Sequence, residues 1–155
     1  MPRSLSEQLL RQVPLLRADQ DLGSAARAVV AAGLPALPVV GDDERYAGIF
    51  GERELITAAF PGYLRELHSA AFVSHAAEEG IELRDCAHEP VADHMNTEHV
   101  DVGSDVSDAR IAEIFLHHRV LIVPVVDDGR VRGVITRADF FKAVADRLRG
   151  GDPGS

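Results

Sequence analysis

The amino-acid sequence predicts an α/β fold made of two copies of one β-α-β-β-α unit. The segments ALPVVGDDERYAGIFGERELI at 36–56 and IVPVVDDGRVRGVITRADFF at 122–141 align with each other along their whole length. Along the chain, Pro124 follows Pro38 at a separation that is one residue longer than the separation between the next aligned pair, Gly48 and Gly133. One residue has therefore been lost in the turn of the second copy. Apolar positions in both copies switch between strand-like runs and helical spacing, which favours the mixed class.

Each copy is predicted to begin with a short extended piece and a helix. Asp21 in the first copy and Ser107 in the second are suitable N-cap residues, and Gly33 is a plausible residue to end the first of these helices. Apolar residues at helical spacing predict one buried face on each helix. These residues are Leu22, Ala25, Ala26 and Val29 in the first copy and Ile111, Ile114, Phe115 and His118 in the second.

Two strands joined by a turn should follow the first helix of each copy. In the second copy, the apolar run VLIVPVV at 120–126 leads to the turn signal DDG at 127–129 and then to VRGVI, which is the pattern of a hairpin. Pro38 and Pro124 each remove a backbone donor from a strand. We therefore expect each proline at a sheet edge or at a bulge.

A second helix closes each copy and sets the division of the chain. In the second copy it carries Phe140, Phe141, Val144 and Leu148, and in the first it stops before Pro61 and Gly62. The expected parts are an N-terminal helix with repeat 1 at 1–60, a partly helical connector at 61–90, repeat 2 at 91–149 and a disordered tail at 150–155.

Length and composition indicate one soluble globular unit in the cytoplasm. The chain has 155 residues, of which 46% are apolar and 26% charged. No apolar run approaches the roughly 20 residues needed to span a bilayer, and the single Cys86 cannot form an internal disulfide. The net charge of −9, with basic residues scattered along the chain, argues against a nucleic-acid surface.

Both copies carry the run apolar-Pro-Val-Val, a turn and a closing Gly-apolar-apolar segment, which in the second copy ends in Thr-x-x-Asp. With this pattern, residues 13–60 and 91–146 resemble a pair of CBS (cystathionine β-synthase) domains, the Bateman module. The resemblance implies two small sheets in a pseudo-two-fold arrangement, helices outside them and clefts between the units. It also implies an adenosine-containing ligand, namely AMP, ADP, ATP or S-adenosylmethionine, and pairing of modules into a homodimer.

The same resemblance implies where the ligand lies. Asp139 would accept hydrogen bonds from both ribose hydroxyls, and Thr136 would contact the ribose or phosphate beside a helix N-terminus. Val134 would line the sugar side, and Arg137 could replace the basic residues that some family members place before the strand proline. The adenine would lie in an apolar pocket of the other unit. The matching positions there are Val13, Pro14, Leu34 and Pro35.

Helix capping offers a second interpretation of the closing motif. Thr136 followed by Asp139 is also a capping-box pattern, in which the hydroxyl caps the helix and the carboxylate reaches back. In repeat 1 the two positions are Gly51 and Glu54, so the hydroxyl is absent and the carboxylate is one methylene longer. A structural cap explains that stretch, and we rank the repeat 1 cleft below the cleft at Asp139.

No catalytic motif and no metal site is predicted. The sequence has no Gly-rich phosphate loop, no nucleophile elbow and no carboxylate pair at a clear spacing. The histidines and the cysteine in or just after the connector lack the tight pairs of zinc sites. They are His68, His75, Cys86, His88, His94 and His99.

We therefore expect a stand-alone regulatory module, not an enzyme, that binds an adenosine-type ligand and acts in trans on an unidentified protein partner. It requires no cofactor and involves neither nucleic acid nor membrane. The alternative is a module that binds no ligand and serves to dimerise or to dock on a partner. Capping accounts for Thr136 and Asp139 in that case, and apolar helix faces account for assembly.

Overall fold

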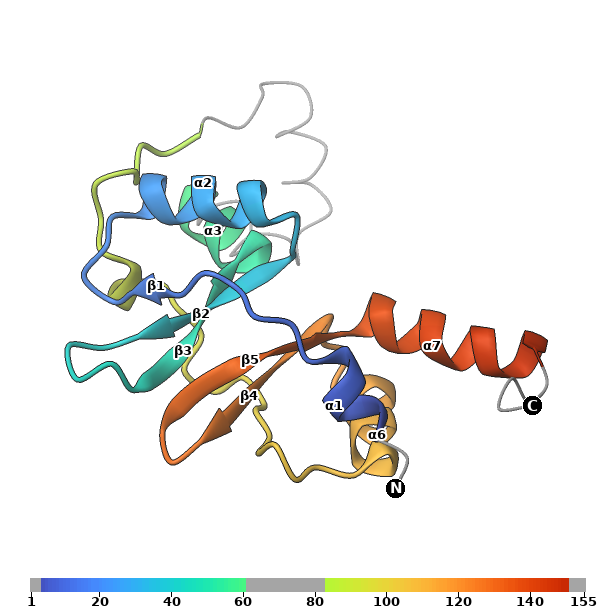
Figure 1. The fold of residues 1–155 in the computed structure, drawn as a ribbon. Helices are drawn as coiled ribbons and strands as arrows, with labels where there is room; N and C mark the ends of the chain where they lie inside the picture. The colour runs from blue at the N-terminus through green and yellow to red at the C-terminus, as the bar shows by residue number, and fades with distance from the viewer. Residues whose placement is uncertain (1–3, 61–82, 151–155) are drawn as a thin grey trace, which may run out of the picture.

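The computed structural model describes residues 4–60 and 83–150, and its elements follow the order expected from the duplication (Figure 1). A short helix α1 (Leu5–Leu9) precedes both repeats. Repeat 1 contains β1 (Leu16–Arg17), α2 (Leu22–Ala32), β2 (Ala36–Val40), β3 (Tyr46–Gly51) and α3 (Glu52–Ala59). Repeat 2 contains the short 3-10 helix η1 (Val91–Asp93), α6 (Asp108–His117), β4 (Ile122–Asp127), β5 (Arg130–Thr136) and α7 (Arg137–Gly150). The predicted α/β class with tandem units is confirmed.

The duplication is visible in the strand register as well as in the sequence. In repeat 1, β1 runs parallel to β2, and β2 is antiparallel to β3. In repeat 2, β4 and β5 form an antiparallel pair, and a parallel bridge from Val102 to Val125 takes the place that the Leu16–Val39 pair has in repeat 1. Both repeats therefore build the same β-α-β-β unit, with the first strand of repeat 2 reduced to one bridge.

The predicted hairpin of repeat 2 is present. Asp127 pairs with Arg130, which leaves a loop of two residues between β4 and β5. Asp128 and Gly129 have φ angles of 51° and 79°, and positive φ at both loop residues is what a type I′ turn requires.

Pro38 is tolerated because of where β1 begins. β2 is the middle strand of its sheet, so of the two expected settings, a sheet edge or a bulge, the edge does not apply to Pro38. However, β1 pairs only with Val39 and Val40, so Pro38 pairs with β3 alone and has no ladder bond to lose on the other side. A register shift follows one residue after each proline, between Val39 and Val40 and at the equivalent place in β4.

The predicted helix caps are confirmed. The Asp21 carboxylate accepts a hydrogen bond from the Ser24 N–H at 2.7 Å, and the Ser107 hydroxyl accepts one from the Arg110 N–H at 3.1 Å. Gly33 ends α2 with a φ of 68°. Satisfying free N–H groups in this way fixes where both helices begin.

The buried faces of α2 and α6 are largely as predicted. Leu22, Ala25 and Val29 on α2 are buried, and Ile111, Ile114 and Phe115 are buried on α6. His118 was expected on the same face but is exposed. The reason is that α6 ends at His117 and the backbone turns at Arg119, whose φ is 53°, so the helical spacing no longer applies.

The N-terminal segment packs on repeat 2, although it is joined to repeat 1 (Figure 1). The Asp108 carboxylate, in the first turn of α6, accepts hydrogen bonds from the N–H groups of Leu5 and Ser6 at 2.8 and 3.3 Å. One carboxylate thus lies at the N-termini of two helices, where negative charge is favoured. Leu9 and Leu10 pack against the core of repeat 2.

Helix α7 extends away from the rest of the molecule (Figure 1). None of its described residues is buried, and Phe141 and Leu148 are 72% and 81% exposed. Phe140 anchors its first turn by packing on Phe115, with ring centroids 5.6 Å apart. Within 4–60 and 83–150, no helix is both long and apolar enough to cross a membrane. Gly150, the first residue of the predicted disordered tail, is the last residue of α7. The rest of that tail and most of the predicted connector lie outside the described residues.

Candidate functional site

A cleft of about 1220 Å³ lies between the two repeats, and both contribute to its walls. Repeat 1 supplies the end of α2, the loop that follows it and the start of α3. Repeat 2 supplies α6, the approach to β4 and the first two turns of α7, and the N-terminal segment adds Arg11. Apolar side chains form most of the surface, in particular Val29, Leu34, Pro35, Phe115, Leu121, Phe140 and Val144.

The cleft brings together five of the eight residues that the sequence assigns to a ligand. Thr136, Arg137 and Asp139 lie on one wall, and Leu34 and Pro35 lie on the other. The remaining three, all described residues, do not line it. Val134 is completely buried, Val13 packs against the core of repeat 1, and Pro14 is exposed.

Thr136 serves as the N-cap of α7. Its hydroxyl oxygen accepts a hydrogen bond from the Asp139 N–H at 3.0 Å, and the residue is only 5% exposed. The N–H of Arg137, the first residue of α7, donates to the carbonyl of Leu121 at 2.9 Å. The Glu52 N–H donates to the carbonyl of Pro35 in the same way in repeat 1. The capping interpretation is therefore correct for Thr136, whose hydroxyl hydrogen can still be donated.

Asp139 has a different partner from the one that a capping box provides. Its carboxylate accepts two hydrogen bonds from the guanidinium of Arg11, from Nε to Oδ2 at 2.7 Å and from Nη2 to Oδ1 at 3.2 Å. This two-point geometry is the strongest form of the Arg–carboxylate contact. The Asp139 side chain remains 26% exposed, so the carboxylate lies at the cleft surface.

Gly133 is the sequence feature that admits Arg11 to this position. The backbone of Arg11 bridges Val134, with its N–H donating to the Val134 carbonyl at 2.8 Å and its carbonyl accepting from the Val134 N–H at 2.9 Å. A Cβ atom on residue 133 would lie 2.2 Å from the carbonyl oxygen of Arg11. The sequence shows this glycine, but nothing near it in the chain indicates which segment approaches.

Repeat 1 uses the equivalent carboxylate in another way. Oε1 of Glu54 accepts a hydrogen bond from the Gly51 N–H at 2.9 Å, so the carboxylate reaches back to the backbone. A Cβ atom on Gly51 would lie 2.1 Å from the carbonyl oxygen of Pro35, which accounts for the missing threonine. A capping box has two hydrogen bonds, and each repeat makes one of them. Repeat 1 makes the bond to the carboxylate, and repeat 2 makes the bond to the hydroxyl. Of these two carboxylates, only that of Asp139 takes no part in a cap, and it lies in the cleft paired with Arg11.

The charges in the cleft are few and of both signs. Arg11 and Arg137 supply two cations, and Asp139 and Glu52 supply two anions. The remaining surface is suited to an apolar, flat group, and the first turn of α7 offers a positive helix end. Chemically, the cleft can hold an aromatic ring, hydroxyl donors that face Asp139 and a negative group near the arginines.

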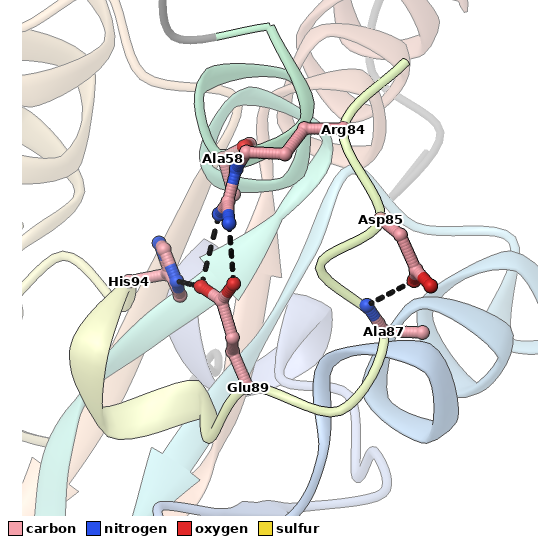
Figure 2. A network of polar contacts seen from close by, with 6 residues as sticks. All are labelled: Ala58, Arg84, Asp85, Ala87, Glu89 and His94. Atoms are coloured by element: carbon pink, nitrogen blue, oxygen red, sulfur yellow. Dashed lines mark hydrogen bonds and ion pairs between the residues drawn. The ribbon is translucent and has the colours of Figure 1, made fainter.

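A separate polar network fixes the chain where the described residues resume after repeat 1 (Figure 2). Arg84 donates from Nε to the carbonyl of Ala58 at 3.1 Å and forms a two-point ion pair with Glu89, which also contacts Nε2 of His94 at 2.7 Å. Arg84 first and His94 second lower the pKa of Glu89 to about 2. The Glu89 carbonyl in turn accepts from the Leu22 N–H, so the network holds the start of α2.

This network and its surroundings also place the side chains considered for a metal. His94 is engaged by Glu89, and the ring of His99 contacts the carbonyl of Ile122 at 2.8 Å. Cys86 is a buried free thiol, whereas His68 and His75 lie outside the described residues. In the part of the chain that the structure describes, no three His, Cys, Asp or Glu residues form a group that could hold a metal ion.

Comparisons with known proteins agree with the duplicated architecture. The sequence model of the CBS domain matches two segments, residues 7–60 and 91–146. Inosine-5'-monophosphate dehydrogenase of Streptococcus pyogenes is 39% identical over 57 residues, which are 36% of this chain and 12% of that enzyme. The curated relatives are thus much longer than the region that this chain matches, which is 12% to 15% of their length.

Solved structures resemble most of the chain. The CBS domain of a CBS domain-containing membrane protein from Sphaerobacter thermophilus is 25% identical, with a TM-score of 0.63 over 90% of this chain and 86% of that one. CBSX2, solved in complex with AMP, is 18% identical, with a TM-score of 0.67 over 96% of this chain and 100% of that one. At 18% identity, the similarity to CBSX2 shows a shared fold.

Proposed function

The chain belongs to the CBS domain family, as a matched pair of CBS domains, and from this premise we propose that it is a regulatory module that binds an adenosine-containing ligand in the cleft between its repeats. The candidate ligands are AMP, ADP, ATP and S-adenosylmethionine. The protein responds to the ligand and acts on a partner in trans, as a homodimer in the cytoplasm, without catalysing a reaction itself.

The observation that carries the proposal is the carboxylate of Asp139. It lies at the cleft surface on the first turn of α7, and the hydrogen bond that caps the helix does not involve it. A carboxylate in this position can accept hydrogen bonds from both hydroxyls of a ribose. Each such charge-assisted bond contributes about 1.5 to 3 kcal/mol, which is enough to orient a nucleoside.

The opposite wall supports the adenine half of the ligand. Leu34 and Pro35 face Leu121 and the start of α7 across the cleft, which gives an apolar slot for a purine ring. The AMP complex of CBSX2 supports the ligand class through the shared fold.

Thermal unfolding in the presence of candidate ligands tests the proposal. Wild type and Asp139→Asn are heated with adenosine, AMP, ADP, ATP or S-adenosylmethionine. A ligand at 100 times its Kd stabilises the folded state by about 2.7 kcal/mol, which for a chain of this size raises the unfolding temperature by roughly 5 to 10 °C. We expect such a rise for wild type with at least one compound and a much smaller rise for Asp139→Asn. A rise of equal size in both proteins would remove Asp139 from the site.

A second function, assembly without a ligand, is favoured by a different observation. Arg11 already satisfies the Asp139 carboxylate, and apolar side chains are exposed on α6 and α7, including Leu116 at 75% and Phe141 at 72%. A docking or dimerisation module would need no more than this. No change in unfolding temperature with any of the five compounds, together with a stable dimer, would favour this function over ligand binding.

A further inference from the structure

The side chain of Arg11 occupies the carboxylate that the proposed function assigns to a ribose. Its guanidinium makes both hydrogen bonds to Asp139, and both residues line the cleft. A ribose that takes the same two carboxylate oxygens must displace the guanidinium. Ligand binding in this cleft is therefore an exchange of partners on Asp139, and its outcome depends on what Arg11 contacts afterwards.

Arg11 cannot leave the cleft when it is displaced. Two backbone hydrogen bonds, of 2.8 and 2.9 Å, join Arg11 to Val134. The preceding residue, Leu10, packs against the core of repeat 2. The N-terminal chain can be followed in Figure 1 from β1 to α1, passing beside β5. With its Cα fixed, Arg11 can only swing its flexible side chain within the cleft or toward its mouth.

The charge balance of the cleft then selects among ligands. A ribose on Asp139 adds no charge, so the cleft still contains the guanidinium groups of Arg11 and Arg137 and the carboxylates of Asp139 and Glu52, but Arg11 has lost its hydrogen-bonded partner. A neutral nucleoside leaves the Arg11 guanidinium without an anionic partner. A ligand with a phosphate supplies a new two-point acceptor for the guanidinium in place of Asp139.

We propose that Arg11 is the specificity-determining residue of the cleft, which selects phosphorylated adenosine compounds over adenosine. The proposal rests on the proposed function, because it needs a ribose on Asp139. It adds a residue that the closing motif does not contain, since Arg11 comes from the segment before repeat 1. In the free protein Arg11 blocks Asp139, and in the complex it pairs with the phosphate.

Calorimetric titration of four proteins with AMP and with adenosine tests this inference. The proteins are wild type, Arg11→Gln, Arg11→Lys and Arg110→Gln. Arg110 is a matched control, because it forms an ion pair with Glu113 on the exposed face of α6 and its replacement changes the net charge by the same amount. The quantity compared is the ratio of the adenosine Kd to the AMP Kd.

We expect wild type and Arg110→Gln to prefer AMP by about tenfold or more, the effect of one good charge-assisted contact. In Arg11→Gln the ratio should fall at least about fivefold, because AMP loses the partner of its phosphate, whereas the relief from competition with Arg11 for Asp139 favours both compounds equally. Arg11→Lys keeps the charge without the two-point geometry and should give an intermediate ratio. The AMP affinity of wild type should also fall more steeply with salt than that of Arg11→Gln.

Two results distinguish a failure of this inference from a failure of the proposed function. If Arg11→Gln binds AMP and adenosine in the same ratio as wild type, the role of Arg11 is refuted and the adenosine site stands. If wild type and Arg11→Gln bind neither compound, this inference fails, and the proposed function fails with it when none of the five compounds raises the unfolding temperature of wild type. Unfolding temperatures report on folding of the variants, which should be little changed because an ion pair this exposed contributes little stability.

Discussion

Replacing Gly133 with alanine should displace the N-terminal segment from repeat 2. The new Cβ would lie 2.2 Å from the carbonyl oxygen of Arg11 and 3.0 Å from Cδ1 of Leu10, and residue 133 has a φ of 154°. A backbone oxygen cannot yield to a collision of this size by a rotamer change. The segment must move, and its two hydrogen bonds to Val134 are the first contacts that it loses.

The expected cost can be worked out from these contacts. The two hydrogen bonds contribute about 0.5 to 1.5 kcal/mol each, and overpacking together with the strained backbone adds about 1 to 3 kcal/mol. The variant should therefore lose roughly 2 to 6 kcal/mol of unfolding free energy in a urea titration. Gly33→Ala is a matched control, since its φ is 68° but its Cβ would meet no atom within 4 Å.

Gly33→Ala should cost only about 1 to 2 kcal/mol, which is the penalty for placing an L-residue in the left-handed region. The difference between the two variants isolates the collision with Arg11 from the conformational term. If Gly133→Ala costs no more than Gly33→Ala, the N-terminal segment does not pack on β5 as described, and the account of Arg11 is refuted.

Three further predictions concern the helix caps and the polar network. Thr136→Val removes the cap of α7 and should lower the unfolding free energy by about 0.5 to 2 kcal/mol in urea, whereas an unchanged value would mean that α7 begins without its help. Glu54→Gln keeps an acceptor for Gly51 and should leave the AMP Kd unchanged by calorimetry, and a loss like that of Asp139→Asn would show that the clefts are ranked wrongly. Because the folded pKa of Glu89 is about 2, below its usual 4.5, the stabilisation that it provides is present above pH 4.5 and is lost as pH falls toward 2. Glu89→Gln should therefore flatten the unfolding temperature over this pH range, by an amount that shrinks with added salt, and profiles of equal slope would contradict the network in Figure 2.

The fold could be predicted from the sequence because its signals are local and occur twice. Asp21 and Ser107 are caps by residue type, and Asp128–Gly129 is a turn signal wherever it stands between two apolar runs. The duplication then gives each weak signal an independent check. His118 was misplaced because apolar periodicity does not mark the residue at which a helix stops.

The site could be predicted only in part, because half of it depends on long-range contacts. Thr136 and Asp139 are close in sequence, so their positions on the first turn of α7 follow from local structure. The contact between Arg11 and Asp139 joins residues 128 positions apart, and no local pattern encodes it. Val134 was placed at the ligand by resemblance, but its side chain points into the core, where the pleat of β5 directs it.

Crystallisation of wild type with AMP gives the most direct test of the central claim, that an adenosine ligand occupies the cleft through Asp139. The account predicts the nucleotide between the repeats, with its ribose hydroxyls within hydrogen-bond distance of the Asp139 carboxylate, its adenine beside Leu34 and Pro35, and Arg11 released from Asp139. A nucleotide bound elsewhere, or an empty cleft in which Arg11 remains paired with Asp139 at saturating AMP, would contradict it.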